Sequence, residues 1–193
     1  MLSVDHIENS IFNSITWILS DSDSDCVWLV DCGDVAPALE LIGKREIVGV
    51  LLTHAHFDHI YGLPELLKQY PICKIYTNES GRETLANAKK NMSFYHESPV
   101  TVEEPCSTIC DEGDTITLFP NITANVYSTP GHHPSCLTFM VGDYFFTGDA
   151  YIPGVKVVTN LPNGNKPLAQ DSLERILKLS EKKRICAGHL SLP

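Results

Sequence analysis

The apolar positions of this chain fall mostly into short runs of strand length, separated by polar and turn-forming residues. Ile11 to Leu19 and Cys26 to Val30 flank the polar run Asp21–Asp25, a pattern typical of two strands joined by a turn. Ile47 to Leu52 is almost entirely apolar, as expected of a strand covered on both faces. Further strands are predicted at 74–77, 115–119, 122–128, 137–141, 144–147 and 184–187.

Between these runs the spacing of apolar residues favours helices over 37–42, 60–70 and 171–179. Asp171 and Glu174 would lie at the favourable amino end of the last helix, with Leu173, Ile176 and Leu177 on its apolar face. Ser80 followed by Glu83 has the form of a capping box and predicts a helix that extends to about Lys90. Asn91–Pro105 shows no clear period. Strands and helices therefore alternate in the first half, and strands dominate the second.

Length and composition fit a single globular domain spanning residues 1–193, because 43% of the residues are hydrophobic and 20% are charged. No apolar stretch approaches the roughly 18–20 residues that a membrane span needs. The first residues lack the features of a secretory signal, so a cytoplasmic location is expected.

The seven cysteines lack C-x-x-C spacing, so we expect reduced and mostly buried thiols. A formal net charge of −10 argues against a nucleic-acid partner. The charge count omits bound cations, however, and two divalent metals would make a site locally positive. Net charge therefore does not identify the ligand.

The strongest chemical signal is the run His54-Ala55-His56-Phe57-Asp58-His59 directly after the apolar strand. Residues two apart in an extended segment project to the same side, so His54 and His56 can face one cation. Imidazole and carboxylate together suit zinc, iron or manganese, and the majority of histidines favours zinc. The alternative is a polar loop in which the histidines occur by chance.

This run resembles the H-x-H-x-D-H motif of the metallo-β-lactamase fold superfamily, and the resemblance extends over nearly the whole chain. Thr129-Pro130-Gly131-His132, Thr147-Gly148-Asp149 and Gly188-His189 match the later motifs of that family in its order. The resemblance implies an α/β protein built as a four-layer αββα sandwich, with the site at the edge between the sheets. It also implies His54, His56 and His132 at one metal, Asp58, His59 and His189 at the other, and Asp149 between them.

Two metals that share a carboxylate leave room for a bridging hydroxide, which would attack an ester, thioester, lactone or phosphoester. We name Asp58 as the catalytic residue beside that hydroxide. Asp31 matches an acidic position of the family and could orient a ligand, or it could simply form a turn. His133 could face the substrate, but a structural or solvent-facing role is favoured because adjacent side chains diverge. We interpret His6 and His96 as surface or packing residues, although His96 lies where a lid could form.

Within the family, the intact Asp58-His59 and Asp149 make the sequence most similar to the glyoxalase II-like branch. True glyoxalase II continues into a helical region that helps hold glutathione, whereas this sequence ends at Pro193, so the substrate stays unassigned. We predict a dinuclear hydrolase with two zinc ions, with iron or manganese as alternatives, acting on a small ester, thioester or lactone. The main alternative is a persulfide dioxygenase-like oxidoreductase with one iron. A β-lactamase, a phosphodiesterase and a metal-binding module without catalysis rank lower.

Overall fold

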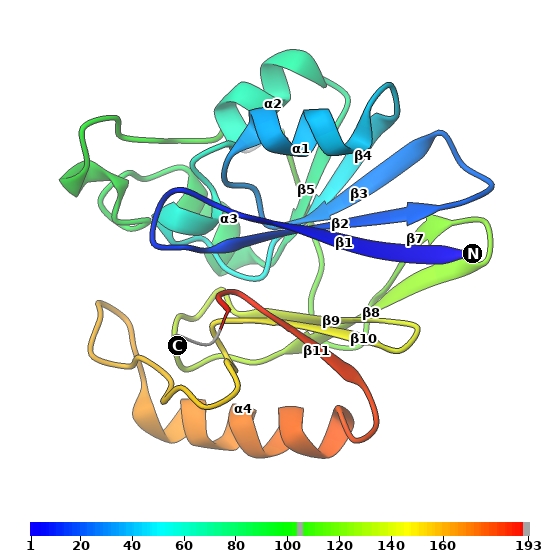
Figure 1. Cartoon of the computed structure of the whole chain (residues 1–193). Helices are drawn as coiled ribbons and strands as arrows, with labels where there is room; N and C mark the ends of the chain where they lie inside the picture. Colours follow the sequence, from blue (N-terminus) through cyan, green and yellow to red (C-terminus); the bar gives the residue numbers. More distant parts are fainter. Residues whose placement is uncertain (104–105, 191–193) are drawn as a thin grey trace.

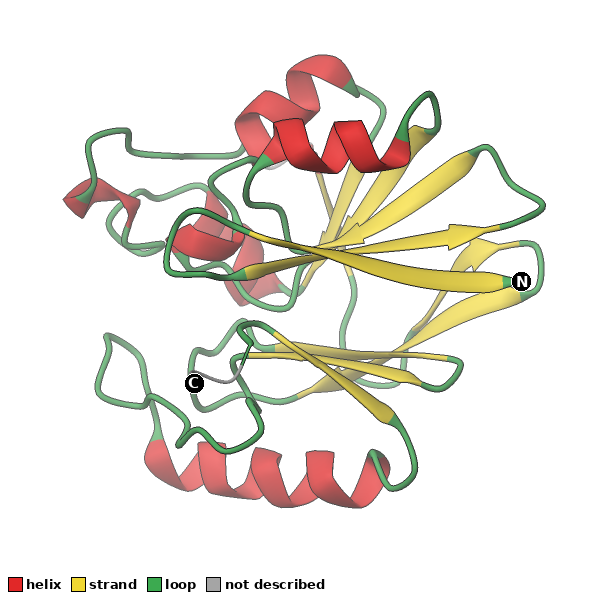
Figure 2. Cartoon of the chain, viewed as in Figure 1, coloured by secondary structure: helices red, strands yellow, loops and turns green. Residues whose placement is uncertain are grey.

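The computed structural model describes residues 1–103 and 106–190. Two β-sheets pack face to face, and helices cover the outer face of each (Figure 1). Figure 2 shows the resulting order of layers, from helix through two sheets to helix. The predicted four-layer αββα sandwich is therefore confirmed.

The first sheet has six strands that follow one another in space as they do in the chain. They are β1 (Leu2–Glu8), β2 (Ile15–Asp21), β3 (Cys26–Val30), β4 (Glu46–Leu51), β5 (Lys74–Thr77) and β6 (Ser107–Ile109). The pairs β1–β2 and β2–β3 are antiparallel, and the pairs from β3 to β6 are parallel. Helices α1 (Val35–Ile42) and α2 (Leu63–Gln69) cover its outer face, and the short helix α3 (Glu79–Leu85) follows β5.

The second sheet has the order β11–β10–β9–β8–β7. Its strands are β7 (Thr115–Phe119), β8 (Ile122–Ser128), β9 (Leu137–Val141), β10 (Tyr144–Gly148) and β11 (Arg184–Ala187). In this sheet β10 and β11 run parallel, because α4 (Lys166–Leu179) crosses the outer face between them, and the other neighbouring strands run antiparallel.

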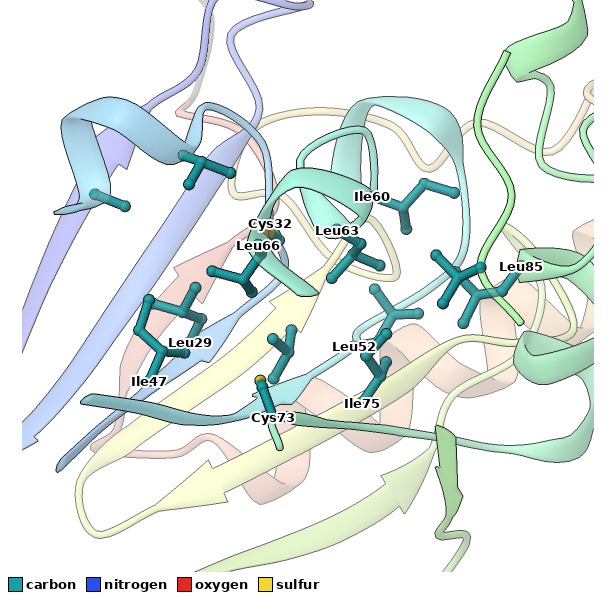
Figure 3. Packing of buried hydrophobic residues seen from close by; sticks show 14 of the residues in the cluster. Leu29, Cys32, Ile47, Leu52, Ile60, Leu63, Leu66, Cys73, Ile75 and Leu85 are labelled. Carbon is teal, nitrogen blue, oxygen red and sulfur yellow. The ribbon is translucent and has the colours of Figure 1, made fainter. Parts of the chain in front are cut away.

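Three clusters of buried apolar residues fill the spaces between the layers. One lies beneath α1 and α2 and includes Leu29, Leu52 and Leu63 (Figure 3). A second fills the space between the sheets, and a third packs α4 through Ile176 against the second sheet. The doubly covered strand β4, with Ile47, Val50 and Leu51 fully buried, is thus held from both sides.

Strand β1 was not predicted, and the predicted start of the next strand at Ile11 is wrong. β1 is an edge strand whose polar positions are exposed, so its sequence carries a weak apolar signal. Residues 11–14 instead form a turn in which Phe12 and Asn13 both adopt φ of 54°. The short edge strand β6 was not predicted either.

Helix boundaries also differ from the predictions. The cap of α3 is Asn78, whose side chain accepts a hydrogen bond from the Gly81 amide, so the capping box at Ser80 is wrong. The helix ends at Leu85 rather than Lys90, because Asn87 accepts hydrogen bonds from the next amides and turns the chain. Glu104 and Pro105, which end the predicted irregular segment 91–105, lie outside the described residues.

The last helix starts five residues earlier than predicted, since Asn165 caps α4 through the Leu168 amide. Asp171 and Glu174 therefore lie in its interior rather than at its amino end. Its buried face is Ala169, Ser172 and Ile176, whereas Leu177 is exposed.

The chain leaves β4 and passes through a 3-10 turn, η1 (Phe57–His59), before α2 begins at Leu63. The predicted helix at Ile60 thus starts three residues too early. A second 3-10 turn, η2 (Ser93–Tyr95), lies within the irregular segment. The seven cysteines are free thiols and five are buried, as expected. Among the described residues, no helix has the length and apolar character needed to span a membrane.

Candidate metal centre

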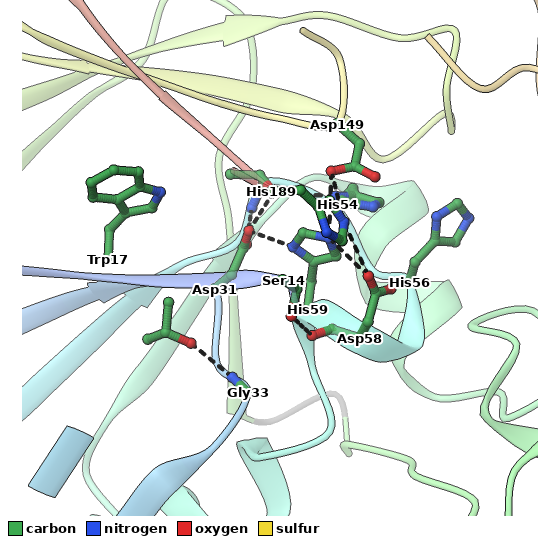
Figure 4. A network of polar contacts seen from close by, with 12 residues as sticks. Ser14, Trp17, Asp31, Gly33, His54, His56, Asp58, His59, Asp149 and His189 are labelled. Atoms are coloured by element: carbon green, nitrogen blue, oxygen red, sulfur yellow. Dashed lines mark hydrogen bonds and ion pairs between the residues drawn. The ribbon is translucent and has the colours of Figure 1, made fainter. Parts of the chain in front are cut away.

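The seven predicted ligands come together at one edge of the sandwich, from the carboxyl ends of strands in both sheets. Figure 4 shows all of them labelled except His132. The first sheet contributes the segment after β4, and the second contributes the segments after β8, β10 and β11. Three overlapping groups have ligand atoms within 4.8 Å of one another: His54, His56 and His132; His54, His59 and Asp149; Asp58, His59 and His189.

Three imidazoles form the first part of the cluster. His56 Nδ1 lies 2.9 Å from His132 Nε2. The rings of His54 and His56 are 4.8 Å apart, and those of His54 and His132 are 4.9 Å apart. All three side chains are buried.

Asp58 is the centre of the second part. Its Oδ2 lies 3.4 Å from His59 Nε2 and 3.3 Å from His189 Nε2. Atoms that bind one zinc ion at about 2.1 Å are at most about 4.2 Å apart, so this spacing fits a shared cation.

Asp149 lies between the two parts. Its Oδ1 is 3.5 Å from both His59 Nε2 and His189 Nε2. Its Oδ2 is 3.6 Å from His132 Nε2. The two carboxylate oxygens of Asp149 therefore face different halves of the cluster.

Several of these buried atoms have no hydrogen-bond partner within the described part of the chain. They include His54 Nε2, His59 Nε2 and Asp149 Oδ1. An unpartnered buried polar atom is costly, and three aimed at one small space require an explanation. A cation in that space would supply the missing partners, so the residues present fit a metal centre.

The opposite ring nitrogens of the histidines are held by hydrogen bonds. His59 Nδ1 lies 2.8 Å from Asp31 Oδ2, His132 Nδ1 is 2.8 Å from the Val158 carbonyl, and His189 Nδ1 is 3.0 Å from the Phe12 carbonyl. A carbonyl or carboxylate only accepts, so each Nδ1 carries the proton. When the ring is neutral, as a metal ligand must be, its Nε2 therefore has the lone pair, and that lone pair points into the cluster.

Asp31 is buried in the left-handed conformation, with φ of 60°. Its carboxylate accepts hydrogen bonds from the Thr53 amide at 2.8 Å and the Thr53 hydroxyl at 2.7 Å, besides that from His59. The Thr53 hydroxyl has thus donated its proton, and its oxygen, 3.2 Å from His54 Nδ1, can only accept there. Asp31 therefore orients His59 directly and His54 through Thr53.

Burial and charge divide the histidines into two classes. Burial, together with neighbouring histidines, lowers the pKa of His56 to about 3 and the pKa of His54 well below its usual value. Burial would also lower the pKa of His189, but the nearby carboxylates of Asp149 and Asp58 outweigh it and raise that pKa to about 9. Burial opposes a charged His59 as well, yet Asp58 and Asp149 raise its pKa well above the usual value. Burial raises the pKa of Asp58, but the charge of His59 and contacts with His189 and His59 outweigh it, so this pKa falls well below the usual range.

The remaining histidines have different surroundings. His133 is buried rather than solvent-facing, because its Nδ1 lies 2.7 Å from the Ser135 hydroxyl, which ties it into the loop. His6 is an exposed residue on β1 that packs near Trp17. His96 stacks on Phe57, with ring centres 4.1 Å apart, and lines a cavity.

This cavity, of about 340 Å³, opens directly on the cluster. Its lining consists of Phe12, His56, Phe57, Asp58, Met92, His96, His132, Asp149, Val158 and Leu161. The sequence analysis interpreted His96 as a surface or packing residue in a stretch where a lid could form, and the structure places it in the cavity wall.

The sequence interpretation also missed Thr53, Phe12 and Val158. Thr53 could have been suspected as a polar residue at the end of an apolar strand. The contributions of Phe12 and Val158 are backbone carbonyls, which no residue type reveals. Only the fold brings them to His189 and His132.

The order and spacing of these segments match a known family over most of the chain. The sequence model described as "Metallo-beta-lactamase superfamily" matches residues 12–189. The chain belongs to this superfamily. The predicted family is thereby confirmed.

Among curated members of the superfamily, a hydroxyacylglutathione hydrolase of Xylella fastidiosa (strain 9a5c) is 32% identical over 178 residues. The match covers 92% of this chain and 60% of that protein. The chain thus spans about three fifths of the length of the curated relatives it matches.

Solved structures show the same superfamily fold. BLEG-1 B3 metallo-beta-lactamase superposes with a TM-score of 0.87 at 24% identity, covering 99% of this chain and 93% of that chain. TTHA1623, solved in a di-iron-bound form, gives a TM-score of 0.79 at 22% identity over 96% of this chain and 91% of that chain. At these identities the likeness concerns the fold.

Proposed function

We propose that this chain is a dinuclear metal-dependent hydrolase that acts on a small ester, thioester or lactone. The observation that carries the proposal is the convergence of buried, unpartnered Nε2 and Oδ atoms from both sheets on one space beside a cavity. Membership of the superfamily and the hydroxyacylglutathione hydrolase relatives support the same reaction class.

In this proposal His54, His56 and His132 hold one ion, and Asp58, His59 and His189 hold the other. Asp149 would be a ligand shared by both ions, which is supported by the distances of about 3.5 Å from its two oxygens to opposite halves of the cluster. Zinc suits this donor set, and iron is the main alternative, since a structural neighbour is described in a di-iron form.

When bound, two divalent ions generate a nucleophile from water at neutral pH and polarise the carbonyl under attack. The residues of the chain prepare that site. Asp31 and the carbonyls of Phe12 and Val158 fix the orientation of the ligand imidazoles. Asp58 stays anionic because its pKa is held low, which keeps it available as the catalytic carboxylate at the edge of the cavity.

The proposal is tested by metal analysis of the purified protein, paired with a panel of thioesters, esters, lactones, phosphodiesters and a chromogenic cephalosporin. About two metal ions per chain and turnover of a carboxylic ester, thioester or lactone are expected. Asp58→Ala should remove most activity, whereas His6→Ala, a histidine on the exposed edge strand, should not.

Two results would contradict the proposal. One iron per chain with oxygen uptake on glutathione persulfide would make the protein an oxidoreductase. A fully loaded metal centre with no turnover across the panel would make it a binding module.

A further inference from the structure

The cavity beside the metal centre has a polar floor and apolar walls. Four predicted ligands form the floor, and the other six lining residues are Phe12, Phe57, Met92, His96, Val158 and Leu161. Five of these six are apolar, and none is a lysine, arginine, aspartate or glutamate. The walls therefore offer hydrophobic contact and no permanent charge.

The apolar walls come from four separate segments that meet at the site edge: the β1–β2 turn with Phe12, η1 with Phe57, the segment around η2 with Met92, and the loop between β10 and α4 with Val158 and Leu161. Figure 1 shows the β1–β2 turn, the segment around η2 and the loop between β10 and α4 at that same edge. Phe12 is 64% exposed and Val158 is 43% exposed, although each lines the cavity. Apolar side chains left open to water beside a catalytic floor are typical of a ligand-binding surface.

The turn that carries Phe12 is strained and is held in place by the site itself. A positive φ at a bulky residue is uncommon and marks a conformation that surrounding contacts enforce. Two hydrogen bonds provide these contacts. His189 Nδ1 donates to the Phe12 carbonyl at 3.0 Å, and the Ser14 hydroxyl donates to the Asp58 carbonyl at 2.7 Å.

Val158 is arranged in the same way. Its carbonyl accepts the hydrogen bond of His132 Nδ1, and its side chain lines the cavity. Two loops thus each give a carbonyl to a predicted ligand and an apolar side chain to the wall. The position of the wall is thereby fixed relative to the reacting centre.

We infer that this cavity binds the acyl group of the substrate, and that the preferred acyl group is uncharged and apolar. This inference rests on the proposed hydrolase function and names its substrate class. A volume of 340 Å³ holds roughly 11 waters at about 30 Å³ each, so a chain of about four to six carbons or one aromatic ring fits.

The test uses thioesters of one uncharged thiol, N-acetylcysteamine, with acetyl, butanoyl and hexanoyl groups, followed by release of the thiol. Each methylene buried against the walls should raise kcat/KM about fourfold, which gives roughly 15-fold from acetyl to butanoyl. The propanoyl thioester should also be preferred to the lactoyl thioester, which differs by one hydroxyl. A flat dependence on chain length, or a preference for lactoyl, would overturn the inference.

Three variants test which side chains cause the dependence of kcat/KM on acyl chain length. Phe12→Ala and Val158→Ala should each lower the butanoyl-to-acetyl ratio of kcat/KM by about threefold or more. Ile72→Ala, which removes an apolar side chain that is 65% exposed but is not part of the cavity lining, should leave the ratio unchanged. Equal butanoyl-to-acetyl ratios in the wild type and all variants would show that the cavity walls do not contact the acyl group.

A binding measurement separates this inference from the proposed function. Calorimetric titration of the metal-loaded protein with hexanamide and acetamide, which lack a labile ester, should give at least tenfold tighter binding of hexanamide. Its heat-capacity change should be negative, as expected for burial of apolar surface. Selective binding of hexanamide without turnover of any ester, thioester or lactone would refute the hydrolase and leave the pocket standing. Thioester turnover with no selectivity in either assay would refute the apolar acyl pocket and leave the hydrolase function standing.

Discussion

Replacement of Asp31 by asparagine tests how the protein controls the lone pairs of its predicted metal ligands. Asparagine has nearly the same shape and tolerates the left-handed backbone that Asp31 adopts. Its amide, however, has one acceptor oxygen where the carboxylate has two. If the oxygen keeps the Thr53 amide, the NH2 group faces His59 Nδ1, where Asp31 Oδ2 now lies at 2.8 Å.

His59 then has to accept at Nδ1, and its proton moves to Nε2, the atom that points into the cluster. The loss of a carboxylate that orients a ligand histidine costs 10- to 100-fold in metal affinity. This corresponds to about 1.4–2.8 kcal/mol. The value is similar to that of one charge-assisted buried hydrogen bond, which is about 1.5–3 kcal/mol.

The assay is a zinc titration against a chromophoric chelator, with ring ¹⁵N chemical shifts of the zinc-loaded protein to report which nitrogen of His59 carries the proton. Asp34→Asn is the matched control, because the Asp34 carboxylate accepts hydrogen bonds from Ser10 and Tyr61 and contacts no predicted ligand. It should leave zinc affinity unchanged. Wild-type zinc affinity in Asp31→Asn, with the fold intact, would refute the orienting role of Asp31.

Three further predictions concern protons, space and packing. Because the pKa of His59 is raised and that of His189 is raised to about 9, both rings are protonated at pH 7 without metal. Binding of two zinc ions should therefore release about three protons per chain at pH 7, two from these rings and one from the water that becomes hydroxide, and fewer above pH 9. Calorimetry in buffers of different ionisation enthalpy measures this number, and release that is independent of pH would contradict the prediction. Gly188→Ala would place a methyl carbon 2.3 Å from Asp149 Oδ1 and 2.8 Å from His59 Cε1, so elemental analysis should find at least one metal ion missing, and full occupancy would refute the clash. Phe139→Ala removes a fully buried ring between the sheets and should lower the free energy of unfolding by about 3–5 kcal/mol in urea titration, and a loss below 1 kcal/mol would show that the site repacks.

The sequence predicted the local parts of this site better than its long-range parts. His54 to His59 form one short segment after an apolar strand, so their common position follows from their closeness in the chain, and the two-residue spacing of His54 and His56 lets both face one cation. The addition of His132, Asp149 and His189 depended on resemblance to a family, because no periodicity places residues from opposite sheets together. The fold class followed in the same way.

Other features could not be read from residue types. The turn at Phe12 and Asn13 was predicted to be strand, since its apolar residues favour one and its positive φ values depend on tertiary hydrogen bonds. Helix α4 was predicted to start at Asp171, because the cap at Asn165 lies before a polar stretch that hides the period. The apolar walls of the cavity are likewise formed by four segments that meet only in the folded protein.

The most direct test of the metal centre is a crystal structure of the purified protein with anomalous scattering data collected at the zinc and iron edges. The account predicts two strong peaks, one among His54, His56 and His132 and one among Asp58, His59 and His189, with Asp149 between them. A single peak, or none at this site in catalytically competent protein, would contradict it.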